Sequence, residues 1–307
     1  MREPPEGLDD AAVLAAVQRH WPREPVVAAT HLPVGFGAHH WRIDAVDGPR
    51  WFATVDTLGV HHDARSLTDA YAAATVLART LPFVWAPVPT TNGAPCGALG
   101  PDRLLSLTPW TDAPVAGDGP LTPDLVAGTA AMLTALHATT PPSRLPRWRP
   151  RVGPDLADRL SRLVDRRWDG GPHGTEARTL VADRVHAIAG WTERYHALAD
   201  VARGADWVVT HGEPHSANQL LLPDGPRLVD WESVALAPRE RDLGGLVAAG
   251  HPVEPPPDPE LLAMYDLEWR LDEISQYADR FAGAHTGDAD DRIALDGLRH
   301  ELTRPEA

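Results

Sequence analysis

Apolar and polar positions near the start of the 307-residue chain follow the two-residue period of half-buried strands. Three such runs cover residues 26–34, 39–46 and 50–58. Gly35-Phe36-Gly37 separates the first two runs, and Asp47-Gly48 is a hairpin signal between the second and third. These positions predict a small antiparallel sheet.

Helical spacing surrounds and interrupts this sheet. Residues 8–20 predict a helix that begins beside Asp9 and Asp10, and residues 63–81 predict a second helix. Two further strands are expected at 84–88 and 104–107, on either side of a loop rich in Gly and Pro. The predicted N-terminal lobe therefore covers residues 1–110.

The pattern changes after residue 110. A linker rich in Pro, Gly and Asp covers 111–120, and most of the chain beyond it has helical spacing. Helices are expected at 121–139, 154–168, 175–203, 241–249, 258–281 and 288–303. Short strands are expected at 207–210, 219–222 and 227–230, the last two joined at Asp224-Gly225. The sequence thus predicts an α+β fold with two lobes, the larger and mainly helical one at 111–307.

Composition narrows the class of protein. The net charge of −15 argues against nucleic acid as the main partner, because binding it requires a basic surface. No apolar run is long enough to span a membrane, and the single Cys96 excludes an internal disulfide, so we expect a cytoplasmic protein, monomeric or homodimeric. An acidic cleft suits a cationic small molecule, although acidity more often serves only solubility.

The chemistry-bearing residues gather between 211 and 232. His211-Gly212-Glu213 is followed by Asn218 and then by Val229-Asp230-Trp231-Glu232. An acid, an amide five residues later and a second acid can orient an acceptor hydroxyl and supply oxygen ligands to Mg²⁺. Taken singly, Asn218 and Asp230 could be plain turn residues. Their coincidence with His-Gly and Asp-Trp-Glu favours a phosphoryl-transfer site.

At these residues the chain resembles the aminoglycoside phosphotransferase family, whose fold is that of the protein kinases. The family's Leu-His-Ala and Arg-Asp-Leu features are also matched, at 136–138 and 241–243. The resemblance implies a nucleotide-binding lobe at 1–110, and a catalytic loop and acceptor site within 111–307. It also implies Mg²⁺ with ATP or GTP as co-substrate. The catalytic residues would be Glu213, Asn218 and Asp230, and the metal ligands Asn218, Asp230 and Glu232.

Two departures from the family pattern stand out. The base position holds Glu213 where Asp is usual, and Thr54 stands where the third strand normally carries a phosphate-binding Lys. The chain contains no lysine at all. Arg42 and Arg65 are the nearest cations in sequence, and each could equally be a surface arginine.

The remaining nucleotide contacts are expected in the N-terminal lobe. The loop with Gly35 and Gly37 would cover the phosphates, although Gly-x-Gly is often only a turn. Phe52 lies on the strand face of Thr54, where it could stack on the base or belong to the core. The expected nucleotide-binding residues are therefore Gly35, Gly37, Arg42, Phe52 and Thr54.

We therefore expect a small-molecule O-phosphotransferase that moves the γ-phosphoryl group of ATP or GTP to a hydroxyl of an antibiotic or related natural product. The alternatives are a degenerate kinase-like binding protein and a nucleotidyl-transferring variant. Part of the acceptor cleft could come from residues 258–281, whose acids and aromatics would otherwise be a solvated face and a core. The candidates there are Asp258, Glu260, Tyr265, Asp266, Glu268, Trp269, Asp272, Glu273 and Tyr277.

Overall fold

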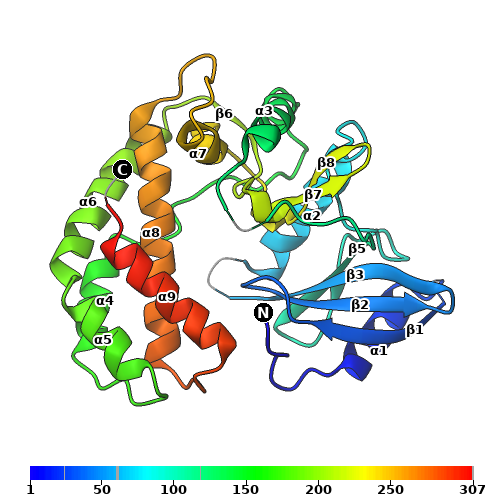
Figure 1. The fold of residues 1–307 in the computed structure, drawn as a ribbon, viewed down its shortest axis with the longest axis horizontal. Coiled ribbons are helices and arrows are strands. Elements are labelled where there is room, and N and C mark those ends of the chain that lie inside the picture. The colour runs from blue at the N-terminus through cyan, green and yellow to red at the C-terminus, as the bar shows by residue number, and fades with distance from the viewer. Residues whose placement is uncertain (24, 60–61, 118, 306–307) are drawn as a thin grey trace. The chain divides into compact units, whose positions relative to one another are not determined.

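The computed structural model describes residues 1–23, 25–59, 62–117 and 119–305 (Figure 1). Residue 118 of the predicted linker and residues 306–307 of the predicted C-terminal lobe lie outside them. The contacts divide the chain into two units. Unit 1 combines Met1–Trp148 with Trp207–Val253, and unit 2 combines Arg149–Asp206 with Glu254–Ala307. The predicted boundary at residue 110 remains a prediction about functional lobes.

Unit 1 begins with an antiparallel sheet of five strands in the order β1-β2-β3-β5-β4. The strands are β1 (Val26–Leu32), β2 (His39–Ala45), β3 (Gly48–Thr57), β4 (Gly97–Ala98) and β5 (Arg103–Pro109). Thr54 of β3 lies opposite His40 of β2 and Ser106 of β5. The sheet and the helical part confirm the expected α+β class with a small antiparallel sheet.

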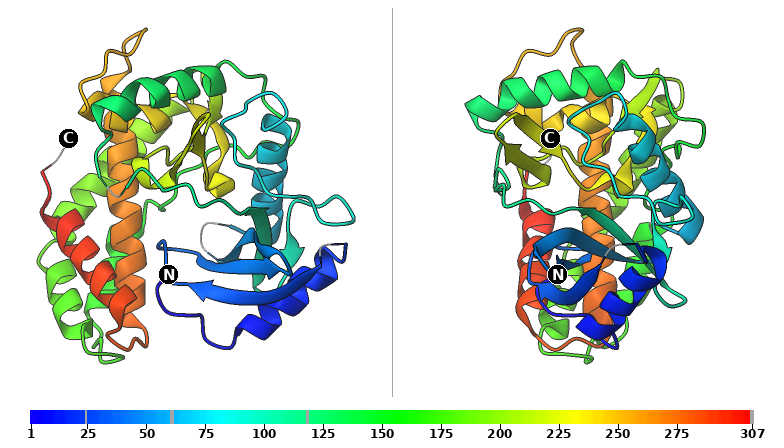
Figure 2. Two further views of the ribbon diagram at one scale, coloured as in Figure 1. Left: turned by 45° about the vertical axis from the view of Figure 1, so that its right-hand side comes forward. Right: turned by 90° about the vertical axis from the view of Figure 1, so that its right-hand side faces the viewer.

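One face of this sheet forms a core with α1 (Asp10–His20), visible in Figures 1 and 2. Val13 and Val17 of α1 pack in the same buried cluster as Trp41, Ala53 and Val55. Because side chains alternate along a strand, the residues between these point to the opposite face. That opposite face carries the even-numbered residues of β3, including Phe52 and Thr54.

The rest of unit 1 holds the motif. It contains α2 (Ala64–Leu77), α3 (Pro123–His137), β6 (Trp207–Thr210), the 3₁₀ turn η1 (Ser216–Asn218), β7 (Gln219–Leu222), β8 (Gly225–Leu228), the 3₁₀ turn η2 (Trp231–Ser233), β9 (Ala235–Pro238) and α7 (Glu240–Ala248). Strands β7 and β8 form a hairpin, and β6 pairs with β9. Helix α2 packs against η2, and α3 packs against β6 and α7.

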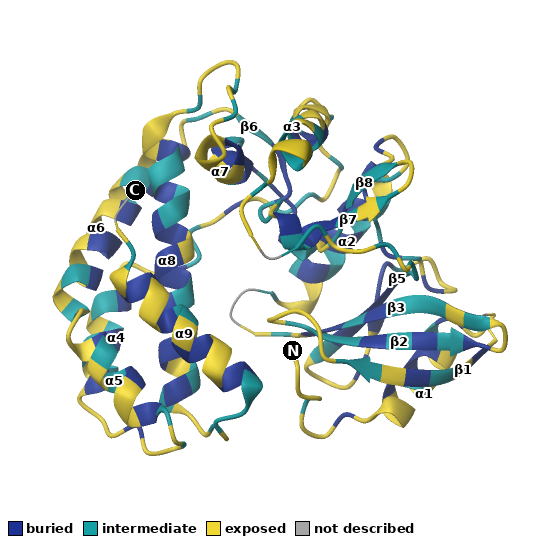
Figure 3. Cartoon of the chain, in the orientation of Figure 1, coloured by how far each residue is buried: buried dark blue, intermediate teal, exposed yellow. Residues whose placement is uncertain are grey.

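Unit 2 is helical in its described residues. It contains α4 (Leu156–Val164), α5 (Gly174–Ala182), α6 (Val185–Ala202), α8 (Pro259–Ala282) and α9 (Ala289–Thr303). Helix α8 packs against α4, α5, α6 and α9. Buried positions recur along α8, among them Met264, Leu267, Leu271 and Ile274 (Figure 3). Their spacing of three to four residues is the apolar stripe that the sequence predicts.

The prediction failed at four places. Residues 84–88 form no strand, because Pro87 and Pro89 lack N–H donors; Val84 makes only an isolated bridge to Leu228. The helix expected at 175–203 is two helices, α5 and α6, separated at Asp183-Arg184. Strands β4 and β9 were not predicted, because Gly, Ala and Pro are poor strand formers.

No helix among the described residues combines the length and the apolar character required to cross a bilayer.

Candidate functional site

The loop after β6 is anchored to α7 through one buried carboxylate. Asp242 accepts hydrogen bonds from the backbone N–H groups of His211 (2.9 Å) and Gly212 (2.7 Å), and from Nε2 of His137 (2.9 Å). Burial alone would raise the pKa of Asp242, but His137 and the loop N–H groups outweigh it and hold the pKa below its usual range. Asp242 therefore holds the backbone of this loop in place.

His211 braces the same loop as a neutral ring. Its Nδ1 accepts from the N–H of Glu213 (3.2 Å), so the proton is on Nε2, which donates to the carbonyl of Val229 (2.9 Å). The residue is fully buried, and loss of water lowers its pKa to about 4. Both ring nitrogens are therefore used to hold the backbone, and His211 is structural.

Arg241 fixes the loop through its guanidinium. Gly212 has φ +102°, and a Cβ at this position would lie 2.4 Å from the Arg241 guanidinium. Nη1 of Arg241 also donates to Thr210 Oγ1 (3.0 Å) and to the carbonyl of Ser233 (2.8 Å). Only glycine allows this close approach with that backbone conformation. The end of β6, the loop and η2 are thus held by one side chain.

The structure brings Glu213, Asn218 and Asp230 together. Nδ2 of Asn218 donates to the backbone carbonyl of Glu213 (3.0 Å), and the N–H of Val229 donates to the carbonyl of Asn218 (3.0 Å). The Glu213 carboxylate accepts from Ser233 Oγ at Oε1 (3.3 Å), and His215 Nε2 lies 3.9 Å from Oε2. Because Nδ2 of Asn218 serves the loop, its Oδ1 is the end that can bind a ligand.

Asp230 has φ 65° and ψ 65°, the left-handed region, and no other described residue besides glycine has a positive φ. Such a conformation in a non-glycine residue often marks a functional position. The residue as a whole is exposed, but the protein around its carboxyl group reduces the hydration of that group and raises its pKa to about 7. The charges of Glu213 and Asp56 act in the same direction. The strand predicted at 227–230 ends at Leu228, which leaves Asp230 in this turn.

A further carboxylate, Asp56 of β3, belongs to the same group and was missed from the sequence. Its side chain is buried, and Oδ2 accepts from the hydroxyl of Tyr71 on α2 (2.8 Å). Burial raises the pKa of Asp56 to about 6, against the opposing effects of Tyr71 and Glu232. Glu232 thus lies beside Asp56. The period-two run Phe52, Thr54, Asp56 was the available signal, since a buried acid in a strand is unusual.

The position of the missing lysine is occupied by a neutral pair. Thr54 Oγ1 lies 3.3 Å from Nδ1 of His40, and the His40 ring packs on Phe52 with 4.9 Å between ring centroids. Burial lowers the pKa of His40 to about 3, and nearby positive groups act in the same direction. The His40 ring is therefore neutral, and the pair of Thr54 and His40 does not replace the positive charge of the lysine.

The other predicted nucleotide-binding residues surround this face. Arg42 lies opposite Phe52, and its Nε contacts Asp44 at 3.0 Å. Gly35 and Gly37, in the loop between β1 and β2, have φ +70° and +101°. A Cβ at Gly35 would lie 3.0 Å from His40 Nε2, so the loop approaches the His40 ring closely. Arg65 is an exposed residue of α2 that lies 3.8 Å from Asp69.

The oxygen donors of this group suit a hard cation. Among the described residues no three His, Cys, Asp or Glu side chains gather closely enough to hold a metal ion by themselves. Mg²⁺ bound with a nucleotide needs fewer protein ligands, because phosphates and water complete its octahedron. Asn218 Oδ1 and the Asp230 carboxylate could supply two, and a cation there would relieve the repulsion that Glu213 and Asp56 exert on Asp230. These residues fit the metal.

Four acids of α8 make contacts within unit 2. Asp266 pairs with Arg304 (2.6 Å), Glu268 accepts from Tyr195 (2.5 Å), Asp272 pairs with Arg151 (3.3 Å) and Glu273 accepts from Tyr277. Glu268 and Asp272 are buried, as is Tyr277. The alternative of a solvated face is therefore wrong for Glu268 and Asp272, the alternative of a core holds for Tyr277, and Trp269 is exposed.

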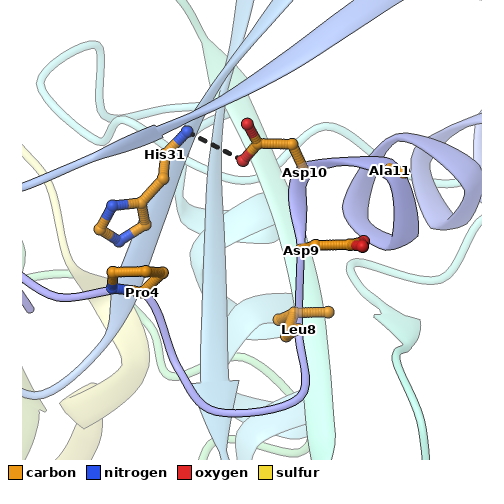
Figure 4. Close-up of a pocket in the computed structure, with 6 residues that line it drawn as sticks. All are labelled: Pro4, Leu8, Asp9, Asp10, Ala11 and His31. Carbon is orange, nitrogen blue, oxygen red and sulfur yellow. Dashed lines mark hydrogen bonds between the residues drawn. The ribbon is translucent and has the colours of Figure 1, made fainter.

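A recess of about 460 Å³ lies beside α1 (Figure 4). Its lining residues are Pro4, Leu8, Asp9, Asp10, Ala11 and His31. Asp10 Oδ1 accepts from the N–H of His31 (3.2 Å) and from Trp41 Nε1 (2.8 Å), so the carboxylate serves the fold. None of the predicted site residues lines this recess.

The five-stranded sheet, its glycine loop and the acid–amide–acid group define the class of protein-kinase-like small-molecule kinases. The model of the phosphotransferase enzyme family (APH) matches residues 28–277. The chain belongs to this family, and it is a phosphotransferase that acts on hydroxyl groups. The resemblance seen in the motifs is thereby confirmed.

Individual relatives agree with this assignment. Protein StrN of Streptomyces griseus is 29% identical over 272 residues, which cover 84% of this chain and 82% of that protein. The structure of spectinomycin phosphotransferase with ADP and spectinomycin superposes with a TM-score of 0.72 at 15% identity, over 98% of this chain and 96% of that one. Amicoumacin kinase superposes with a TM-score of 0.59 at 13% identity, over 96% and 93%. These two likenesses show a shared fold.

Proposed function

We propose that the protein is a magnesium-dependent kinase that transfers the γ-phosphoryl group of ATP or GTP to a hydroxyl of an antibiotic or related natural product, in resistance or in biosynthesis. The observation that carries the proposal is the convergence of Glu213 and Asn218, on the loop anchored by Asp242, with Asp230 in the turn after β8. Phosphoryl transfer requires mainly positioning and charge stabilisation, which a rigid loop supplies.

Glu213 is the proposed base. One oxygen of its carboxylate accepts from Ser233, and the other lies on the side of His215, whose side chain is 48% exposed. An acceptor hydroxyl that hydrogen-bonds the second oxygen would be oriented toward the γ-phosphoryl group, and its proton would pass to Glu213. Glu213 is longer than aspartate by one methylene, and the hydrogen bond from Ser233 would hold its carboxylate in place.

Asn218 and Asp230 are the proposed ligands of Mg²⁺, which when bound neutralises the phosphate charge of the nucleotide. Glu232 was predicted as a third ligand. Because it lies beside Asp56, we propose that it interacts with the Asp56 carboxyl in place of the metal. The nucleotide would lie on the sheet face of Phe52 and Thr54, beneath the loop with Gly35 and Gly37. Arg42 is the proposed cation for its phosphates.

The acceptor is proposed to carry both a hydroxyl and a positive charge. Asp56, Glu213, Asp230 and Glu232 gather four acidic side chains in a chain with a net charge of −15. Such a group attracts cations and disfavours anionic acceptors. Structural neighbours are named as kinases of choline and aminopropanol, both amino alcohols, which supports this acceptor class. A cytoplasmic location and a monomer or homodimer remain predictions from composition.

A panel of acceptors tests the proposal. The purified protein would be incubated with Mg²⁺, ATP or GTP, and spectinomycin, amicoumacin, choline or aminopropanol, and the products weighed by mass spectrometry. We expect one phosphoryl group to be added to a hydroxylated amine. Addition of a nucleotidyl group would instead support the nucleotidyl-transferring alternative. Nucleotide binding without any product, or with hydrolysis only, would contradict the proposal and favour the binding protein that the missing lysine suggests.

A further inference from the structure

Ser233 contacts the proposed base although no sequence motif singled it out. Its hydroxyl donates to Oε1 of Glu213 at 3.3 Å, and the residue is 8% exposed. The bond is long for a hydroxyl donor, which is common for catalytic hydrogen bonds before substrate binds. A buried donor aimed at the carboxylate restricts where that carboxylate can lie.

The position of Ser233 is itself fixed by the backbone. Its carbonyl accepts from Nη1 of Arg241 (2.8 Å), and the same Nη1 donates to Thr210 Oγ1 (3.0 Å). Thr210 in turn donates to the carbonyl of Ala235 in β9 (2.9 Å). Ser233 therefore belongs to a rigid connection between β6, η2 and α7, and not to a mobile surface loop.

The contact with Ser233 matters because the side chain of Glu213 is longer than that of aspartate. Glutamate has one more rotatable bond than aspartate, so its carboxylate samples more positions unless a partner holds it. A hydrogen bond at Oε1 restricts that freedom and fixes the direction of Oε2, the oxygen beside His215 that the acceptor hydroxyl is proposed to approach. An aspartate at 213 would be shorter by one methylene and would lie out of reach of the Ser233 hydroxyl.

We propose that Ser233 is a positioning residue, held by Arg241, that orients the Glu213 carboxylate for phosphoryl transfer. This inference rests on the proposed function and deepens it. Ser233 adapts the site to glutamate in the base position, and its effect on turnover depends on which acid occupies position 213.

A double-mutant cycle tests this dependence. Initial rates would be measured with Mg²⁺-ATP and the panel acceptor that reacts fastest, or with water as acceptor, for wild type, Ser233→Ala, Glu213→Asp and the double variant. We expect Ser233→Ala to lower kcat about tenfold in wild type, with KM for ATP unchanged. In the Glu213→Asp background the same change should alter kcat less than about twofold. Ser233→Thr, which retains the hydroxyl, should restore most of the rate.

Equal losses in both backgrounds, or a loss confined to KM, would show that Ser233 acts on the fold alone and would overturn the inference. Crystal structures of wild type and Ser233→Ala provide a readout that does not require turnover. We expect the Glu213 carboxylate in hydrogen-bond contact with Ser233 in wild type and spread over several rotamers in the variant. A wild-type carboxylate turned away from Ser233 would refute the inference. Absence of any Mg²⁺-dependent turnover would instead refute the proposed function, which keeps the two failures distinct.

Discussion

At the scale of single residues, the site consists of a group predictable from local spacing and a group that is not. His211, Glu213 and Asn218 lie in the connection between β6 and β7, Asp230 follows β8 and Asp242 lies on α7, so their spacing in sequence predicted one site. Asp56 lies far upstream and joins the group only because β3 lies close to η2 through α2. Ser233 could not be predicted from the sequence either, because its contact with Glu213 depends on the path of the 3₁₀ turn η2.

His211 makes stability depend on pH. Its folded pKa of about 4 lies below the ordinary 6.5, so between these values the unfolded chain takes up a proton that the folded protein does not. Stability that is fully present above pH 6.5 is therefore lost as the pH falls toward 4. The loss amounts to about 3 kcal/mol, at about 1.4 kcal/mol for each pKa unit.

The variant His211→Gln isolates this effect, because glutamine can donate and accept without titrating. Urea unfolding at pH 7 and at pH 4.5 would give the free energies of unfolding of both proteins. We expect the advantage of wild type over the variant to shrink by about 2–3 kcal/mol at the lower pH. A difference independent of pH would mean that His211 is not held neutral by burial.

At the scale of elements, periodicity predicted most helices and strands because each buries one face. It failed where a tertiary contact decides the outcome. The pattern through Asp183 and Arg184 contains neither Gly nor Pro, so nothing local indicates the break between α5 and α6. Strand β9 exists because its backbone pairs with β6, and a short apolar segment does not reveal its partner.

The contact of α2 with β3 is an element-scale feature with a measurable energy. Tyr71→Phe removes the hydroxyl that donates to the buried Asp56. We expect the free energy of unfolding at pH 8, where Asp56 is charged, to fall by about 2 kcal/mol, because a buried carboxylate loses a donor. In the double variant with Asp56→Asn, the combined change should differ from the sum of the single changes by about 1 kcal/mol. Additive effects would show that the two side chains are not coupled.

At the scale of the whole molecule, the chain order does not reveal the units. Unit 1 takes its residues from two separate segments, and unit 2 is formed by the segments that lie between and after them. The linker and the change to helical spacing after residue 110 suggested a single division there. Such a local change does not reveal which distant segments pack together. The absence of lysine from the whole chain has a clearer consequence. We propose that this phosphotransferase, which has no lysine, binds nucleotide through metal, arginine and backbone groups.

Magnesium-dependent nucleotide binding is the central claim, and thermal unfolding measures it most directly. The midpoint would be recorded with ATP and with GTP, each with and without Mg²⁺, for wild type, Asp230→Asn and Asp224→Asn. Asp224 is a matched control, since it lies in the turn of the β7–β8 hairpin and pairs with Arg227 at the surface. Ligand that binds only the folded state must raise the midpoint.

We expect a rise of several degrees in wild type and in Asp224→Asn that requires Mg²⁺, and none in Asp230→Asn, which should remain folded without ligand. A rise that survives in Asp230→Asn, or that occurs equally without Mg²⁺, would contradict the proposal that Asp230 is a metal ligand.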